Sequence, residues 1–242
     1  MPKAKYDEIY MSLKKAVEDG VHGYGTLLPS ENTLITQYGC SRNTIRRALA
    51  GLADGGYVQP IHGKGVRVIY QPGGRAMFAV GGIESFQETA QRNQLHVVTK
   101  VARFALRQVD EQLAAESGFP VGEAVYDIQR VRVLDGKPLI LDLNIFLQSL
   151  VPGLTAGIAE RSVYAYIEKD LGMQIATSKR TITVEHATEL DKQLLDLGDY
   201  NCLAVVSNQT FNADGVMFEY TQSRHQPDYF SFHDTAARKK IC

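Results

Sequence analysis

An internal repeat runs through the C-terminal two thirds of the chain and restricts its fold more than any other property of the sequence. Short motifs recur after about 80 residues, as Asp-Glu-Gln-Leu at Asp110 and Asp-Lys-Gln-Leu at Asp191, glycines at Gly118 and Gly198, and Asp-Gly pairs at 135–136 and 214–215. Alternating apolar segments flank each Asp-Gly pair, which predicts strands joined by tight turns. We expect two copies of a strand–helix–strand–hairpin–strand unit, packed as an α+β domain around an antiparallel sheet. A ligand site is expected where the two halves meet.

The N-terminal part of the chain predicts three helices. Apolar residues three and four apart give residues 5–19 one apolar face. Ser30 is a suitable N-cap and Gly39 a suitable stop for a second, short helix, and Ser41 is a suitable N-cap for a third. Two short helices joined by a tight turn with glycine are typical of a helix-turn-helix.

A predicted hairpin follows, with strands over 57–61 and 66–70 joined by His-Gly-Lys-Gly, which completes a winged helix-turn-helix. In such a motif the start of the last helix enters the major groove, where arginine suits guanine and asparagine suits adenine. Glycines in the wing allow a close approach to DNA. The residues that we expect to contact DNA are Ser30, Ser41, Arg42, Asn43, Thr44, Arg46, Arg47, His62, Gly63 and Lys64.

The charge distribution supports a nucleic-acid partner for the N-terminal part. The chain has a net charge of −1, but residues 1–70 hold nine Lys and Arg against six Asp and Glu. The positive field that phosphate binding requires is therefore confined to this part. Its excess is modest, so we expect a homodimer that presents two such modules.

Composition and spacing place the chain among cytoplasmic, reduced proteins. Three cysteines lie far apart without metal-ligand spacing, and no stretch of about 18 apolar residues or signal peptide is evident. We expect no metal, no cofactor and no membrane partner. Proline and four glycines over 71–82 predict a linker between a DNA-binding domain, 1–70, and a second domain, 83–242.

The second domain contains a candidate anion site. Arg130 and Arg132 are two residues apart on one predicted strand, so they project from one face, and their fork geometry suits phosphate. Ser162 at a predicted helix start adds donors. Four further side chains could bind sugar hydroxyls, namely Asp142, Glu185, Glu219 and Tyr229. Spacing alone favours the alternative, an exposed strand whose outer face is basic.

The N-terminal segments resemble the GntR family of bacterial regulators. The matching residues are Leu28-Pro29-Ser30-Glu31, Tyr38-Gly39, residues 41–49, Leu52, Gly56-Tyr57 and Gly63-Lys64-Gly65. The resemblance implies that Arg42 and Arg46 read the operator and that Gly63 contacts the minor groove. Asn32 departs from the pattern, because some relatives place there an arginine that reaches DNA. This departure puts direct readout from the second helix in question.

Residues 82–235 look like the ligand-binding UTRA domain of the HutC subfamily, which has a chorismate-lyase-like fold. The matching segments are 81–86, 129–139, 162–172 and 218–232. The resemblance implies that phosphate is held by Ser85, Arg130, Arg132, Ser162 and Tyr164, and that Glu219 and Tyr229 face a sugar. With the residues above, the expected effector set also contains Phe86, Asp142, Glu185 and Arg224.

Within this subfamily the chain is similar to repressors of trehalose-utilisation operons, which implies trehalose 6-phosphate as the effector. The alternatives are glucosamine 6-phosphate, N-acetylglucosamine 6-phosphate or urocanate. A lyase-like enzyme is the rival from another class, but the sequence offers no nucleophile–base pair, and His186 and His225 are isolated. We therefore expect a regulator and not an enzyme. Whether it represses or activates depends on operator position, which lies outside the chain.

Overall fold

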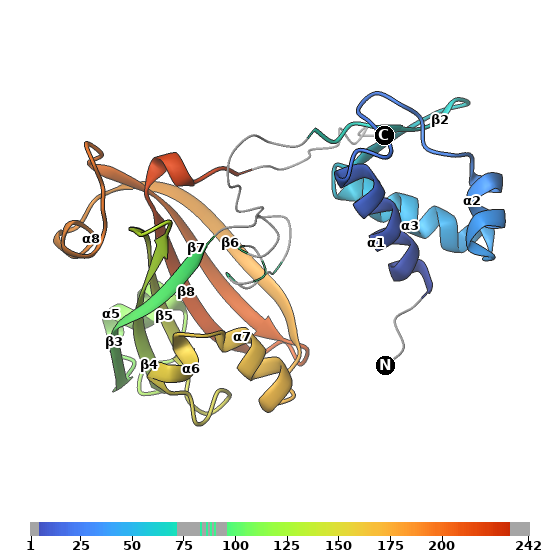
Figure 1. Ribbon diagram of the computed structural model, residues 1–242. Helices are drawn as coiled ribbons and strands as arrows, with labels where there is room; N and C mark the ends of the chain where they lie inside the picture. Colours follow the sequence, from blue (N-terminus) through green and yellow to red (C-terminus); the bar gives the residue numbers. More distant parts are fainter. Residues whose placement is uncertain are drawn as a thin grey trace, which may run out of the picture. The chain divides into compact units, whose positions relative to one another are not determined.

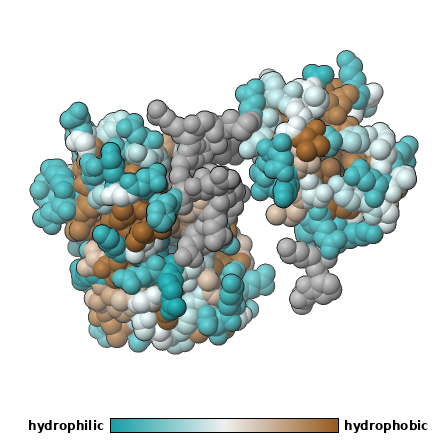
Figure 2. All heavy atoms as spheres, viewed as in Figure 1, coloured by the Kyte–Doolittle hydropathy of each residue, from teal (hydrophilic) through white to brown (hydrophobic). Residues whose placement is uncertain are grey.

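The chain forms two compact units, which are described separately. The computed structural model describes residues 5–71, 83, 86, 88, 90 and 96–232. Of the predicted linker, 71–82, only Gln71 belongs to the described residues. Figure 2 shows hydrophilic side chains over much of the visible surface of each unit, with hydrophobic side chains in patches between them. In the described parts of the chain, no helix is long and apolar enough to cross a membrane.

The N-terminal unit is the predicted winged helix-turn-helix (Figure 1). Its elements are α1 (Lys5–Glu18), α2 (Glu31–Tyr38), α3 (Arg42–Asp54), β1 (Val58–Ile61) and β2 (Gly65–Val68). The core is formed by the apolar faces of the three helices and by the inward residues of the hairpin, including Ile9, Leu13, Leu34, Ile45, Leu52 and Val68. Strand β2 begins one residue earlier than predicted and ends at Val68, because Ile69 and Tyr70 instead donate backbone hydrogen bonds to Tyr57.

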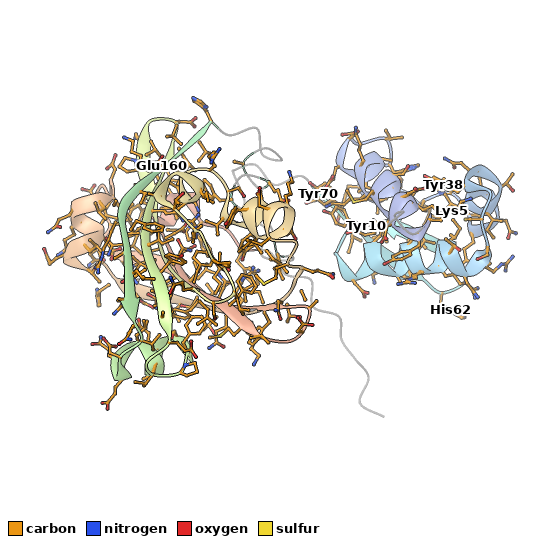
Figure 3. All side chains as sticks on the ribbon, turned by 90° about the horizontal axis from the view of Figure 1, so that it is seen from below. Lys5, Tyr10, Tyr38, His62, Tyr70 and Glu160 are labelled. Carbon is orange, nitrogen blue, oxygen red and sulfur yellow. The ribbon has the colours of Figure 1, made fainter. Side chains whose placement is uncertain are left out.

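Capping residues define the short turn between α2 and α3. Ser30 caps α2, and Gly39 ends it with a φ of 56°, in the left-handed region that glycine adopts without strain. Lys5 donates from Nζ to the Gly39 carbonyl at 2.9 Å, and Ser12 bonds the Tyr38 hydroxyl at 3.0 Å. Figure 3 shows Lys5 and Tyr38 together at this end of the unit. Helix α1 therefore holds the turn in place.

The C-terminal unit is a six-stranded antiparallel sheet with short helices on both faces. Its strands are β3 (Val97–Gln108), β4 (Ala124–Leu134), β5 (Lys137–Leu147), β6 (Ile175–His186), β7 (Cys202–Asn212) and β8 (Met217–His225). Its helical elements are α5 (Glu111–Ser117), α6 (Ala156–Ala159), α7 (Val163–Ala165), η1 (Tyr166–Asp170), α8 (Glu189–Leu194) and η2 (Pro227–Tyr229). The expected α+β class and antiparallel sheet are confirmed.

The strand order, β3-β4-β5-β8-β7-β6, shows how the internal repeat is used. One copy contributes β3, α5, β4 and β5, and the other contributes β6, α8, β7 and β8 in the same order. The last strands of the two copies, β5 and β8, pair antiparallel at the centre of the sheet. The two copies are therefore related by an approximate two-fold axis through the sheet.

The two faces of the sheet have different covers. Helices α5 and α8 pack on one face, against apolar residues such as Val125, Val131 and Val205. Helices α6 and α7 pack on the other face, against Ile128 and Phe146. Because side chains alternate along a strand, polar residues at 130, 132 and 142 point to the α6–α7 side.

In the C-terminal unit, three further elements differ from what the sequence predicts. The segment 161–172 predicts one helix, but it forms a three-residue α7 followed by the π-helical turn η1. The segment 189–198 predicts a helix that ends at Gly198, but α8 ends at Leu194, because Leu195 adopts an extended backbone. The segment 179–187 predicts a strand, but β6 begins four residues earlier, at Ile175, because its first residues pair with the end of β7.

Candidate functional site

The exposed face of α3 carries the side chains predicted to read DNA. Arg42, Asn43 and Arg46 are exposed, whereas Ile45 between them is fully buried in the core of the unit. Arg47 is exposed as well, but its guanidinium carbon lies 3.7 Å from the centre of the Tyr6 ring on α1. Burial of the apolar side of α3 thus fixes the direction in which its basic side faces.

Two adjacent residues of α2 hold two arginines of α3. Arg42 donates from Nη2 to Oδ1 of Asn32 at 2.8 Å. One turn further along α3, Arg46 donates from Nε to both carboxylate oxygens of Glu31 at 3.1 Å. The sequence singled out Asn32 only as a departure from relatives and did not indicate that it bonds Arg42. These hydrogen bonds restrict the rotamers of Arg42 and Arg46 and so hold both guanidiniums in position on the exposed face of α3.

Two predicted DNA contacts, Ser30 and Ser41, serve as helix caps in this structure, and a third, Thr44, bonds Ser41. The Ser30 hydroxyl accepts from the Thr33 amide at 3.1 Å. The Ser41 hydroxyl accepts from the Thr44 amide at 3.2 Å and bonds the Thr44 hydroxyl at 2.8 Å. These bonds fix the starts of α2 and α3, and contacts to phosphate from the same hydroxyls remain a prediction.

The wing places its tip residues in solvent. His62, Gly63 and Lys64 are exposed, and the Lys64 amide closes the turn on the Ile61 carbonyl at 3.0 Å. Gly63 has a φ of 71°, which a side chain would strain. Figure 3 shows His62 at the outer edge of the unit. The turn therefore offers a side-chain-free backbone flanked by two basic residues.

A second polar site lies on the α6–α7 face of the sheet, where Arg130 and Arg132 share one carboxylate. Arg132 donates from Nε to Asp142 at 2.7 Å and lies 2.6 Å from it through Nη2. Arg132 also donates to Thr99 at 2.6 Å, and Arg130 Nη2 lies 3.8 Å from the same Asp142 oxygen. All three charged side chains are almost completely buried. The predicted exposed basic strand is therefore replaced by a buried ion cluster.

A chain of hydrogen bonds leads from this cluster across the centre of the sheet. Arg130 donates to Asn144 at 2.8 Å, and Asn144 donates to Thr221 at 2.8 Å. Thr221 and the hydroxyl of Tyr164 both donate to Glu219, at 2.8 and 2.6 Å. The network joins β4, β5, β8 and α7, so it positions Tyr164 over the midline between the two repeats.

The electrostatics of the cluster leave its arginines short of negative charge. Burial and the neighbouring Arg132 lower the pKa of Arg130 to about 10, although Asp142 and Glu219 act in the opposite direction. Burial alone would raise the pKa of Asp142, but Arg132 and Arg130 lower it below its usual value. Burial raises the pKa of Glu219, which weakens its contribution as a counter-charge. Among the described residues, Asp142 is the carboxylate that pairs with both buried guanidiniums.

A small cavity opens beside these arginines. Its volume is about 50 Å³, and its described lining consists of Phe86, Arg130, Arg132, Arg161, Ser162, Val163 and Tyr164. Phe86 lies against the Arg132 guanidinium, 4.5 Å from ring centre to carbon. Pockets for whole small molecules usually measure about 300–1,000 Å³, so this cavity suits one small polar group. A larger hollow of about 480 Å³ adjoins it and shares Arg161 and Ser162.

Two residues of the predicted effector set lie on the other face of the sheet. Arg224 donates to Asp191 of α8 at 2.9 Å and to Glu185 at 2.8 Å. Because Ser223 bonds Asp142 on the α6–α7 side, its neighbour Arg224 must point to the opposite side. The sequence could not assign these faces, because register was unknown. Arg224 and Glu185 attach α8 to the sheet instead of joining the arginine cluster.

The remaining predicted effector residues are placed as follows. Ser162 caps α7 by accepting from the Ala165 amide at 3.2 Å, and it lines the cavity. Tyr229 packs with Phe86 on an apolar cluster at the end of the sheet. Ser85 lies outside the described residues. The structure therefore groups Phe86, Arg130, Arg132, Asp142, Ser162, Tyr164 and Glu219.

Sequence analysis missed several polar residues that complete the site. They are Thr99, Asn144, Arg161, Thr221 and Ser223. Asn144 and Thr221 could have been found, because each lies two residues from a predicted site residue on its own strand. Among the described residues, no group of three His, Cys, Asp or Glu side chains could hold a metal ion.

Comparison with known proteins identifies both units. Residues 5–68 match the gntR family of bacterial regulatory proteins, and residues 92–231 match the UTRA domain. The chain is 39% identical over 236 residues to the HTH-type transcriptional regulator TreR of Bacillus subtilis, with 98% of each chain covered. It is 27% identical to the mannosyl-D-glycerate transport/metabolism system repressor MngR of Escherichia coli, again with 98% of each covered.

Solved structures agree with this assignment. The possible transcriptional regulator YydK of Bacillus subtilis superposes with a TM-score of 0.80 over 97% of this chain and 100% of that one, at 23% identity, which supports the fold. The effector-binding domain of the B. subtilis trehalose repressor TreR is 38% identical. It covers 59% of this chain and 99% of its own, with a TM-score of 0.54.

Proposed function

Because this chain belongs to the GntR family of bacterial regulatory proteins, with a UTRA domain after its helix-turn-helix, we propose that it is a transcriptional repressor released from its operator by a sugar phosphate, trehalose 6-phosphate. The observation that carries the proposal is the pair of buried arginines that share Asp142 beside a cavity of about 50 Å³. Similarity to a trehalose repressor supports the choice of sugar.

The phosphate group is the part of the effector that fits the cavity. A phosphate monoester carries about −1.5 to −2 charges at neutral pH, and its oxygens match the planar fork of arginine. Arg130 and Arg132 would each exchange part of their contact with Asp142 for a phosphate oxygen. Ser162 and Arg161 on the cavity wall add a hydroxyl and a further cation. Ser85 belongs to this proposal from the sequence alone.

The sugar would then lie over the centre of the sheet. The Tyr164 hydroxyl and the Glu219 carboxylate lie side by side, 2.6 Å apart. Such a pair can bond two neighbouring hydroxyls of a pyranose ring. The cavity of about 50 Å³ holds the phosphate alone, so the sugar must extend beyond it, and we expect the side chains that line it to move when the sugar binds. This movement connects effector binding to a change of conformation.

On the DNA side, Arg42 and Arg46 read base edges while Lys64 and His62 bind phosphates or the minor groove. A single helix-turn-helix with this small positive excess has too small a footprint for tight specific binding, so the protein binds as a homodimer to paired half-sites. Effector and operator oppose each other, and thermodynamic reciprocity requires each to weaken the other by the same factor.

A thermal-shift screen tests the proposal. The purified chain is heated with trehalose 6-phosphate, glucosamine 6-phosphate, N-acetylglucosamine 6-phosphate, trehalose and inorganic phosphate. Stabilisation grows as RT ln(1 + [L]/Kd), so the true effector gives the largest shift at equal concentration. We expect trehalose 6-phosphate to give this shift and trehalose to give none. Equal shifts with trehalose and its phosphate would contradict the proposal, and turnover of a sugar phosphate would favour an enzyme.

A further inference from the structure

The two-fold repeat gives the arginine cluster a counterpart in the second half of the sheet. The two Asp-Gly turns begin at 135 and 214, an offset of 214 − 135 = 79 residues. Leu143↔Gln222 is the β5–β8 pair with the same offset, so the axis passes through this pair. Rotation about it exchanges Asp142 with Thr221 and Asn144 with Ser223. Each residue of the first half therefore has a definite equivalent in the second.

The equivalents of the two arginines follow from strand pairing. Arg130 pairs with Asp142 on β5, and the residue that pairs with Thr221 on β8 is Asn208 of β7. In the same way, Arg132 corresponds to Thr210. The second half thus has an amide and a hydroxyl where the first has two guanidiniums. At these equivalent positions, the paired guanidiniums that suit a phosphate occur in the first half, and the second half has neutral donors and acceptors, which suit sugar hydroxyls.

An arginine on the edge strand completes this second group. Arg180 of β6 pairs with Asn208 and donates from Nε to its Oδ1 at 2.8 Å, and Ser178 donates to the same oxygen at 3.4 Å. Both bonds use Oδ1, so the Asn208 Nδ2 group has no acceptor among the described residues. Asn208, Arg180 and Ser178 are only partly buried. Asn208 Nδ2 therefore offers a donor on the same face of the sheet as Arg130.

Tyr164 lies between the two groups. It lines the small cavity beside Arg130 and bonds Glu219 on the central strand β8. Its hydroxyl also interacts electrostatically with Arg130 and with Arg180. Strand β4 and strand β7 are three strand spacings apart, about 14 Å. This span matches two linked sugar rings with a phosphate at one end, and it exceeds the reach of one ring.

We propose that Asn208 and Arg180 form a second subsite, which binds the sugar ring that carries no phosphate. This subsite selects a disaccharide phosphate over a monosaccharide phosphate, and it rests on the proposed function, in which the arginine cluster holds the phosphate. Asn208 Nδ2 donates to a ring hydroxyl, and Arg180 and Ser178 hold the Asn208 amide in this orientation through Oδ1. Recognition of the effector is therefore divided between the two repeats, with two buried guanidiniums for the phosphate in one and an amide donor for a ring hydroxyl in the other.

Calorimetric titration of the full chain with trehalose 6-phosphate and with glucose 6-phosphate tests the subsite. For Asn208→Ala and Arg180→Gln we expect the affinity for the disaccharide phosphate to fall about tenfold, as for loss of one hydrogen bond, with the affinity for glucose 6-phosphate unchanged. Lys179→Ala is the matched control, because Lys179 is a cation on the same strand that lies over Phe211 instead. It should change neither affinity.

The outcomes separate this proposal from the proposed function. Suppose that wild type binds trehalose 6-phosphate. If both variants then bind the two sugar phosphates with equally reduced affinity, or with unchanged affinity, the second subsite is wrong and the phosphate site stands. If wild type binds no sugar phosphate while it still binds DNA, both proposals fail. Arg180→Gln at the sheet edge serves as the second variant if Asn208→Ala does not fold, as judged by circular dichroism.

Discussion

Replacement of Asp142 by asparagine should destabilise the C-terminal unit strongly. The Asp142 carboxylate lies 2.7 and 2.6 Å from Arg132, 3.8 Å from Arg130, and 2.6 Å from the Ser223 hydroxyl. Asparagine keeps the shape but leaves two buried guanidiniums without an ionised partner. Breaking a buried ion pair from one side costs about 3–5 kcal/mol. At about 2–4 °C per kcal/mol for a unit of this size, the melting temperature should fall by about 6–20 °C.

The control is Asp127→Asn on the same strand pair. Asp127 also contacts two arginines, with Arg107 at 2.9 Å and Arg103 at 3.7 Å, but both arginines are partly exposed. Asp127 itself is largely buried, but water reaches both of its arginines, so we expect a smaller loss than for Asp142→Asn. Urea unfolding at neutral pH compares the two variants. The variant Asp142→Asn should also recover more stability than wild type when phosphate is added, because the anion replaces the missing charge. Equal, small losses in both variants would refute the account of the buried cluster.

Three further predictions concern the DNA contacts and pH. Arg42→Ala should cost about 1–3 kcal/mol with operator and relax sequence preference, whereas Lys64→Ala should weaken operator and random DNA alike in gel-shift titrations. Asn32→Ala should reduce the ratio of operator to random-DNA affinity without changing the melting temperature, because Asn32 acts through Arg42; an unchanged ratio would refute this role. Burial lowers the pKa of His225 from 6.5 to about 4, so stability present above pH 6.5 should be lost as pH falls toward 4. His225→Gln should flatten that pH dependence of urea unfolding, and an unchanged slope would contradict it.

The sequence predicted the order of elements better than their contacts. Capping residues such as Ser30 and Gly39 act within one turn of chain, so the starts and ends of α2 and α3 could be predicted. The Asp-Gly turns identified both hairpins and thereby the repeat. The same local signals carry no information on how the repeats pair. The central β5–β8 contact, which builds the site, appears only in the structure.

At the candidate site, the sheet face on which a residue lies was the property that the sequence predicted least well. Arg130 and Arg132 lie on one strand, so their common face followed from alternation alone. Arg224 lies on a different strand, and its face depends on the register between β8 and β5. It was therefore grouped with the cluster although it bonds Asp191 on the other side. Side-chain bonds across helices, such as Arg46 to Glu31, had no signal in the sequence.

The most direct test of the account is release of the protein from DNA by a phosphorylated sugar. Operator DNA is first selected from a random pool by the purified protein, and its complex is followed by fluorescence anisotropy. Trehalose 6-phosphate should lower operator affinity by about 5–150-fold, while trehalose should leave it unchanged. Arg132→Ala loses the main partner of Asp142 and should be less stable, so circular dichroism first establishes that it is folded at the assay temperature. The folded variant should still bind operator but fail to respond. Release by both sugars, or a full response from Arg132→Ala, would contradict the claim that the buried arginines bind the effector phosphate.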